Sequence, residues 1–443
     1  MRRFPGGRRA LWITGWLGAA GWAAVLAAVS ALPMHRVWGL CAAVGYLGAA
    51  LLACLLPRPR ARALSVGSAL TGAVAVPFVH LLATGRAQSE VGVIERSAAT
   101  LLHSGTPYLT DPRVVTDYNP YLPGMALFGI PARLFGDGSA PARLAGDPRL
   151  WCAVVLLVCL LAGRAVLRRS GGTPGGAVDA PTRTASAAAT AVLVASPPVA
   201  LPLCVSGVDL PLTGLLALAL ALAACHRPVP AALVLAAACS LKWTALPAVV
   251  VVVALLAGGS GPRAAARCAA VWAAGTAALV LPAVLAAPGP LVEQVFLFPT
   301  GRADLPTPAA SPLPGRLLAD LGPAGWYAAV LLLVCGGSAV AVSLALRLPA
   351  GVVAAADRLA VGLCVAFLFA PAGRFGYFAL PLLLAVWARL ATGPSRARPS
   401  SSVRPTSTAR PIFSVRPRVS SAAVPASVAA VAGARPVSLR GRR

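Results

Sequence analysis

Residues 231–256 read Ala-Ala-Leu-Val-Leu-Ala-Ala-Ala-Cys-Ser-Leu-Lys242-Trp-Thr-Ala-Leu-Pro-Ala-Val-Val-Val-Val-Val-Ala-Leu-Leu, an apolar run with one charge near its centre. Among the 38 Lys and Arg residues of the chain, Lys242 is the only lysine. A cation at membrane depth costs about 2.5–3.5 kcal/mol on insertion scales, and such residues usually face a polar cavity and a counter-charge. The run therefore predicts a membrane-embedded segment with a functional site around Lys242.

The arginines predict how this run crosses the membrane, because Lys and Arg gather in cytoplasmic loops. Arg263 and Arg267 stay on the cytoplasmic side with Arg227 only if the run 229–257 crosses twice, or dips in and returns. Lys242 then lies at the external turn between two short half-helices, and such broken helices can line a cavity. The alternative is one long tilted span, which would reverse the topology of everything downstream.

The composition extends this interpretation to the whole chain. The sequence is 58% hydrophobic and only 11% charged, with a mean hydropathy of +0.80. Runs near the 20 apolar residues of a spanning helix recur throughout it. We therefore predict an all-α polytopic membrane protein with 10–12 transmembrane helices in a membrane domain at 1–391. The expected spans are 11–32, 37–56, 64–85, 150–168, 184–203, 208–225, 229–242, 243–257, 264–286, 325–347, 356–371 and 376–391.

The formal charge of +26 follows the positive-inside rule and does not indicate nucleic acid as a partner. Ten arginines and no acid lie in the last 50 residues, which suits attraction to anionic membrane lipids. The tail 392–443 is rich in Arg, Pro and Ser, which predicts a disordered cytoplasmic segment. We expect a multi-pass protein of the plasma membrane with both termini in the cytoplasm.

Two long loops then face outward, at 86–149 and 287–324. The first holds six of the twelve acids, and its segment 90–102 carries Val91, Ile94, Ala98 and Leu101 at helical spacing. This spacing predicts an amphipathic helix on the outer membrane surface. Within it, Glu95 and the neighbouring arginine are expected to form a surface ion pair.

Several chemistries have no signature in the sequence. The ten cysteines show neither CxxC nor Cys/His spacing, so a metal site is not predicted. No P-loop, GxGxxG or HExxH motif is found, which argues against a soluble nucleotide-binding domain. We expect no cofactor.

The first external loop nevertheless resembles a known family. Two stretches of its sequence are similar to the corresponding loop of the C-type glycosyltransferases. They are Glu90-Val-Gly-Val-Ile-Glu-Arg-Ser-Ala-Ala-Thr-Leu-Leu-His-Ser-Gly105-Thr-Pro-Tyr108 and Tyr118-Asn-Pro-Tyr-Leu-Pro. The similarity is greatest to family 87, the polyprenyl-phosphate-mannose-dependent mannosyltransferases, in which an acid opens an amphipathic helix and Gly-x-Pro-Tyr and Tyr-Pro-Pro elements follow.

Three later stretches resemble the family in the same order. They are Ser206-Gly-Val-Asp209-Leu, Leu241-Lys242-Trp-Thr-Ala-Leu-Pro and Ala370-Pro-Ala-Gly-Arg374-Phe-Gly-Tyr-Phe, so the resemblance runs from about 86 to 390. Glu90 stands where the family usually has aspartate, Trp243 where it has proline, and Arg374 where a neutral residue is typical.

The resemblance implies inverting transfer of a hexose, most simply mannose, from a polyprenyl phosphate to a glycolipid or glycan acceptor outside the cytoplasm. Such transfer needs a base for the acceptor hydroxyl and cations for the phosphate that leaves. Glu90 is the candidate base, with Asp111 and Asp117 as alternatives. The candidate phosphate ligands are Lys242, Arg302, Arg316 and Arg374. The candidate contacts of the sugar or acceptor are Asp209, Tyr108, Tyr118 and Tyr121.

Other roles stay open for these residues. Glu90 and Asp209 are residue types that favour helix N-termini, and the aspartates of the turns can cap backbone amides. Lys242 can extend to the membrane interface without a ligand. A transporter or flippase for an anionic lipid or a small anion would use a cation at a broken helix equally well, and an inactive family member is a third possibility.

Overall fold

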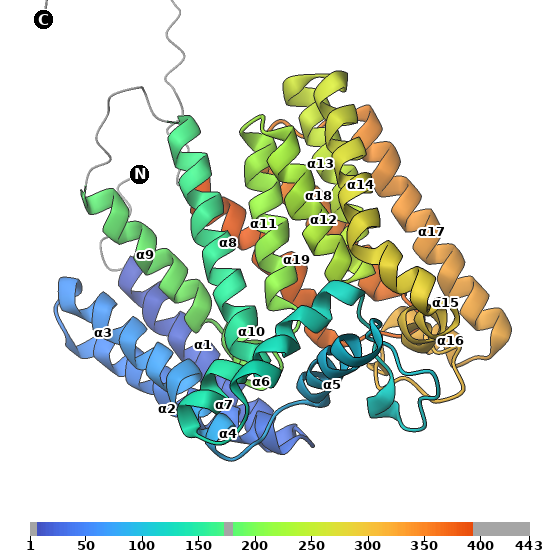
Figure 1. Ribbon diagram of the computed structural model, residues 1–443. Coiled ribbons are helices and arrows are strands. Elements are labelled where there is room, and N and C mark those ends of the chain that lie inside the picture. Colours follow the sequence, from blue (N-terminus) through green and yellow to red (C-terminus); the bar gives the residue numbers. More distant parts are fainter. Residues whose placement is uncertain (1–6, 172–179, 393–443) are drawn as a thin grey trace, which may run out of the picture. The chain divides into compact units, whose positions relative to one another are not determined.

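The computed structural model describes residues 7–171 and 180–392. The tail predicted to be disordered, 392–443, lies outside the described residues except for its first residue. The described chain is helical, and the all-α polytopic prediction is confirmed (Figure 1). Its α-helices are α1 (Gly7–Val29), α2 (Pro33–Leu55), α3 (Arg58–Leu70), α4 (Val76–Ala83), α5 (Ser89–Ser104), α6 (Ile130–Phe135), α7 (Ala140–Gly146), α8 (Pro148–Gly171), α9 (Ala180–Ala195), α10 (Pro197–Val205), α11 (Leu210–Ala224), α12 (Pro228–Leu241), α13 (Leu246–Ser260), α14 (Pro262–Ala286), α15 (Pro288–Leu291), α16 (Pro314–Ala319), α17 (Pro323–Leu346), α18 (Val352–Phe369) and α19 (Ala379–Thr392).

Shorter helical turns complete the fold. The segments Thr71–Ala75 (η1) and Val292–Leu297 (η5) are π-helical. The 3₁₀ turns are η2 (Val115–Asp117), η3 (Pro123–Gly129), η4 (Trp243–Ala245), η6 (Phe298–Thr300) and η7 (Phe375–Phe378). Many helices begin with proline, α2, α8, α12 and α14 among them, because a residue at the first helical position needs no backbone N–H partner.

Within the described residues, nine helices are long and apolar enough to cross a membrane. The pair α9–α10 makes a tenth if it is one span, whereas α11 and α12, which form at the predicted spans 208–225 and 229–242, are apolar but shorter than the other candidates. One prediction needs correction: 184–203 is not a straight span, because the chain bends by 63° between α9 and α10. Pro197 and Pro198 follow this bend, and a residue before proline is disfavoured in helical conformation.

α11 lies at the centre of the bundle. Almost all of its side chains are buried, and it packs against α8, α12, α13, α18 and α19. Figure 1 shows it between α8 and α12. A helix that is apolar on every face is expected to be enclosed by others. Asp209 immediately precedes α11, so it is held at one end of this enclosed helix.

The long apolar run breaks at Lys242, as the double crossing predicted. Lys242 has an extended backbone (φ −150°, ψ 139°) between α12 and η4. α13 then returns toward the start of α12. A contact between their outer ends shows this: the imidazole Nδ1 of His226, just before α12, lies 2.7 Å from the hydroxyl of Ser260, at the end of α13. The single long span is therefore excluded. Pro247, in the first turn of α13, suits a helix restart immediately after the break.

The first long loop packs onto this break. The backbone N–H of Leu122 donates to the Leu241 carbonyl at 3.0 Å, which satisfies one acceptor at the open end of α12. Gly124 lies so close to Ser240 that a Cβ at this glycine would come within 2.3 Å of the serine hydroxyl. The sequence around Tyr121 is therefore fixed beside Lys242.

Candidate functional site

Lys242 has both a counter-charge and an aromatic neighbour. Its ammonium donates to Asp209 Oδ1, and it lies 4.9 Å from the centre of the Tyr121 ring. The Lys242 side chain is 13% exposed, whereas that of Asp209 is 37% exposed. Asp209 occupies the N-cap position of α11, as its residue type favours, but its side chain makes no capping hydrogen bond and binds Lys242 instead. A cation in such surroundings is stabilised by charge and by the ring quadrupole together.

Glu90 also has a cationic partner. It lies in the first turn of α5, whose predicted amphipathic character is confirmed by the burial of Val91, Ile94 and Ala98. The guanidinium of Arg374 donates to Glu90 Oε1, although the two residues are 284 positions apart in the sequence. The Glu90 side chain is 15% exposed. Neither residue is therefore a simple solvated surface charge.

Two tyrosines join these ion pairs into one cluster. Glu90, Asp209 and Arg374 all act electrostatically on the buried Tyr121. Tyr377, in η7, interacts in the same way with both cations and both carboxylates. Burial, reinforced by the charge of Glu90, raises the pKa of Tyr121 well above its ordinary value, so this phenol is a neutral hydrogen-bonding group at physiological pH.

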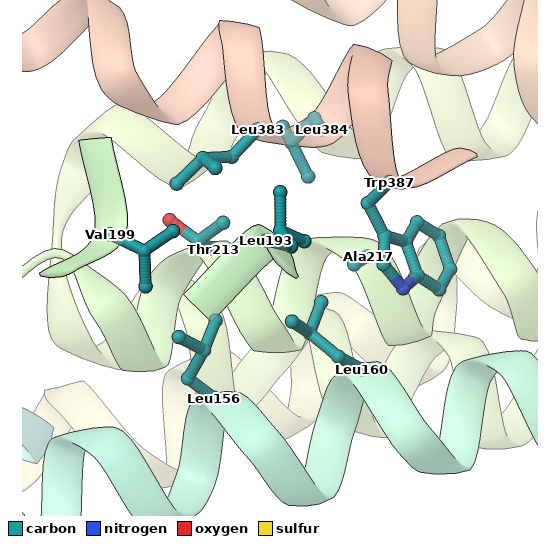
Figure 2. Close-up of a pocket in the computed structure, with 9 residues that line it drawn as sticks. All are labelled: Leu156, Leu160, Leu193, Val199, Thr213, Ala217, Leu383, Leu384 and Trp387. Carbon is teal, nitrogen blue, oxygen red and sulfur yellow. The ribbon is translucent and has the colours of Figure 1, made fainter. Parts of the chain in front are cut away.

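A small crevice opens beside the cluster. It is lined by Asp209 and Tyr377 together with apolar side chains of α10, α11 and α19. A neighbouring cavity, drawn in Figure 2, shares Thr213 and Leu383 with it. That cavity is apolar except for Thr213 and carries no charged side chain. Of these two hollows, only the crevice brings a carboxylate and a phenol to its lining.

The other two predicted cations lie in different surroundings. The guanidinium of Arg302 stacks over the Trp326 ring at 4.7 Å. Arg316 pairs with Asp320 at 2.6 Å, one helical turn further along. No contact in the described part of the chain joins either arginine to Lys242. The structure thus brings Lys242 and Arg374 together with the two carboxylates, and it leaves Arg302 and Arg316 outside this cluster.

Asp117 and Asp111, the two alternative bases, bind groups within their own turn. Asp117 accepts the backbone N–H groups of Arg113 and Val114 at 3.0 and 3.1 Å. The first of these hydrogen bonds is the main cause that lowers the pKa of Asp117, which makes its carboxylate a weaker base. Asp111 pairs with the Arg113 guanidinium at 2.6 Å in an exposed position. Neither aspartate belongs to the cluster around Glu90.

Tyr108 and Tyr118 hold the two long loops rather than the cluster. The Tyr108 hydroxyl donates to the Tyr121 carbonyl at 2.9 Å. The Tyr118 hydroxyl donates to Glu293 at 3.0 Å, and its ring stacks on Phe298 at 4.3 Å. Burial, with the Glu293 contact, raises the pKa of Tyr118 to about 12. The Tyr108 hydrogen bond closes the first long loop on itself, and the Tyr118 hydrogen bond joins the first loop to the second.

The predicted surface pair of Glu95 is wrong. Arg96 donates instead to the Thr116 carbonyl, and Glu95 is half-buried near Asp147 and Arg149. Burial, followed by the charge of Asp147, raises the pKa of Glu95 above its ordinary 4.5. The ionised carboxylate is therefore less favourable in the folded protein than in the unfolded chain. The stability linked to its protonated form is complete below about pH 4.5 and is lost as the pH rises through the folded pKa.

From this sign we expect Glu95→Gln to stabilise the protein at pH 7, raising the apparent melting temperature by about 1–3 °C. Near pH 4, where Glu95 is itself protonated, the gain should disappear. Thermal unfolding in detergent at both pH values measures it, with the exposed Asp137→Asn as the control for removal of an acid from the same loop. A loss of stability at pH 7 would contradict the expectation.

The sequence motifs assign no role to two residues that the structure brings to the site or beside it. Tyr377 lies within a stretch that resembles the family, and Arg149 is buried at the start of α8. A signal existed for Arg149, since a charge at the start of an apolar run needs a partner. No group of three or more potential metal ligands occurs in residues 7–171 and 180–392; the absence of a cofactor stays a prediction.

Comparison with known proteins now adds to this geometry. A family model described as glycosyltransferase family 87 matches residues 119–371, more than half of the chain. This match includes Asp209 and Lys242, whereas Arg374 lies three residues after its end and Glu90 lies 29 residues before its start. No curated protein and no solved structure gave a match. With its series of apolar helices, the chain is a multi-pass membrane protein, and it belongs to glycosyltransferase family 87.

Proposed function

We propose that this chain transfers a hexose, mannose in the first instance, from a polyprenyl-phosphate donor to a glycolipid or glycan acceptor. The reaction takes place on the extracytoplasmic side of the plasma membrane and inverts the configuration at the sugar carbon. Glu90 is the base, and Lys242 and Arg374 bind the donor phosphate. The observation that carries this proposal is the union of two cations and two carboxylates from four distant segments in one cluster.

The ion pairs suggest how the donor is received. In the protein alone, each cation is neutralised by a carboxylate, which reduces the cost of partial burial. A donor phosphate is negatively charged, as each carboxylate is, and it offers several acceptor oxygens. It can therefore replace Asp209 at Lys242 and Glu90 at Arg374. Glu90 then loses its guanidinium partner when the donor arrives, and it becomes free to accept a proton.

The chemistry that follows is a single displacement. The acceptor oxygen attacks the anomeric carbon and loses its proton to Glu90, while the bond from that carbon to the phosphate oxygen breaks. The electron pair leaves with the lipid phosphate, whose added negative charge is stabilised by Lys242 and Arg374 in poorly hydrated surroundings. One carboxylate is enough for this inverting reaction. Asp209, Tyr121 and Tyr377 are available to hold the sugar or the acceptor.

The test uses the purified full-length protein in liposomes that contain a glycolipid extract as acceptor. Radiolabelled polyprenyl-phosphate-mannose should yield a labelled glycolipid and free polyprenyl phosphate, whereas GDP-mannose should yield neither. Polyprenyl-phosphate-glucose in a parallel reaction determines whether the hexose is mannose. Label that crosses the bilayer without transfer would overturn the proposal in favour of a lipid carrier, and transfer from GDP-mannose would overturn the donor class.

A further inference from the structure

A buried ion pair lies at the start of α8, outside the cluster. The side chains of Asp147 and Arg149 are 7% and 3% exposed, and the guanidinium binds both carboxylate oxygens at 2.6–3.2 Å. The guanidinium carbon of Arg149, Cζ, lies 5.3 Å from the centre of the Phe78 ring. Charges this deeply buried are costly unless they are paired and fully hydrogen-bonded. The pair therefore indicates a role that an apolar contact would not fill.

The remaining donors of Arg149 join two distant segments. One guanidinium nitrogen, Nη1, donates to the Arg86 carbonyl at 3.2 Å and to the Cys204 carbonyl at 2.7 Å. Next to this link, the Gln88 backbone N–H donates to the Val205 carbonyl at 2.8 Å. Arg149 thus holds the end of α10 beside the segment that enters α5.

Each of these segments leads to one carboxylate of the cluster. Glu90 follows Gln88 by two residues, and Asp209 follows Cys204 by five. Between Cys204 and Asp209 the chain turns at Gly207, which has a φ of +74° and packs against Arg149: a Cβ there would lie 3.2 Å from the Arg149 Cα. The backbone on both approaches is therefore fixed by the same residue.

We propose that Arg149, held by Asp147, is a positioning residue that sets Glu90 and Asp209 in register with each other. This inference rests on the proposed function, because the register matters for transfer. The guanidinium suits the role, since its planar fork can bind a carboxylate with two nitrogens and still donate to both carbonyls. A lysine could neutralise Asp147, but its single ammonium cannot reproduce the fork.

Arg149→Lys separates these two properties. We expect the variant to fold, because the buried charge of Asp147 stays neutralised, and to lose about 10²-fold in kcat with little change in the KM for the donor. Deuterium exchange should accelerate at the Gln88 amide and through residues 202–209, while α11 to α14 keep the exchange of the wild type. A residue with a merely structural role would instead change the amount of folded protein and leave kcat per folded molecule unchanged.

Arg389→Lys is the matched control, because Arg389 also binds an aspartate, Asp357, with two nitrogens, but at an exposed position. It should leave kcat and exchange at Gln88 as in the wild type. Wild-type kcat, or wild-type exchange at Gln88 and 202–209 in Arg149→Lys, would overturn the positioning role. If the wild-type protein transfers no sugar, the proposed function fails, and exchange in the two variants still shows whether Arg149 joins the two segments.

Discussion

Glu90→Gln should reduce sugar transfer by about 10²- to 10⁴-fold, the range that a positioned acid or base contributes. Glutamine keeps the size of the side chain and an acceptor oxygen for Arg374, but it cannot take the proton of the acceptor hydroxyl. The fall should therefore be in kcat, with donor binding retained or strengthened because Arg374 loses its competing carboxylate. Transfer of radiolabelled mannose by equal amounts of folded protein measures both quantities.

Asp137→Asn is the control, since it also replaces a carboxylate by an amide in the first long loop, at an exposed residue away from both ion pairs of the cluster. It should keep transfer near the wild-type level. Transfer that persists in Glu90→Gln and is lost in Asp117→Asn or Asp111→Asn would move the base to one of those aspartates. A carrier without catalysis would move the labelled donor across the bilayer, and none of these substitutions would abolish that movement, because it involves no proton transfer.

Lys242→Met should lower kcat/KM by about 10²- to 10³-fold, the cost of removing one preorganised donor from a developing anion. Methionine keeps the length and apolar character of the side chain, so the break between α12 and α13 is preserved. The substitution removes the counter-charge of Asp209 and the cation beside the Tyr121 ring. Because Lys242 is proposed to bind phosphate before and during transfer, both the KM for the donor and kcat should change.

Asp209→Asn distinguishes the charge of Lys242 from its ion pair. If the lysine serves the donor, the asparagine variant keeps the cation and should bind polyprenyl phosphate as tightly as the wild type or more tightly. If the pair serves only to stabilise the fold, both substitutions should lower the melting temperature equally and leave kcat/KM per folded molecule unchanged. Equilibrium binding of polyprenyl phosphate and thermal unfolding in the same detergent decide between these outcomes.

Local features of the sequence predicted much of the architecture. Hydrophobic length predicted which segments form apolar helices, because a segment in lipid must satisfy its backbone within a helix. The arginines at 227, 263 and 267 predicted the reversal at Lys242, and the spacing of apolar residues in 90–102 predicted α5. The bend between α9 and α10 was missed because their combined apolar run is long enough for a straight span, and hydropathy does not record direction.

The candidate residues were chosen from motifs, yet their partners could not be. The sequence by itself determined an all-helical membrane protein with a broken helix at a lone lysine, since hydropathy, proline and charge act over a few neighbouring residues. Only the tertiary structure decided that Lys242 pairs with Asp209, that Glu90 pairs with Arg374, and that Arg149 joins the segments leading to both acids. Those contacts span 33, 284 and 55 positions, and they depend on how the helices pack, which no local pattern encodes.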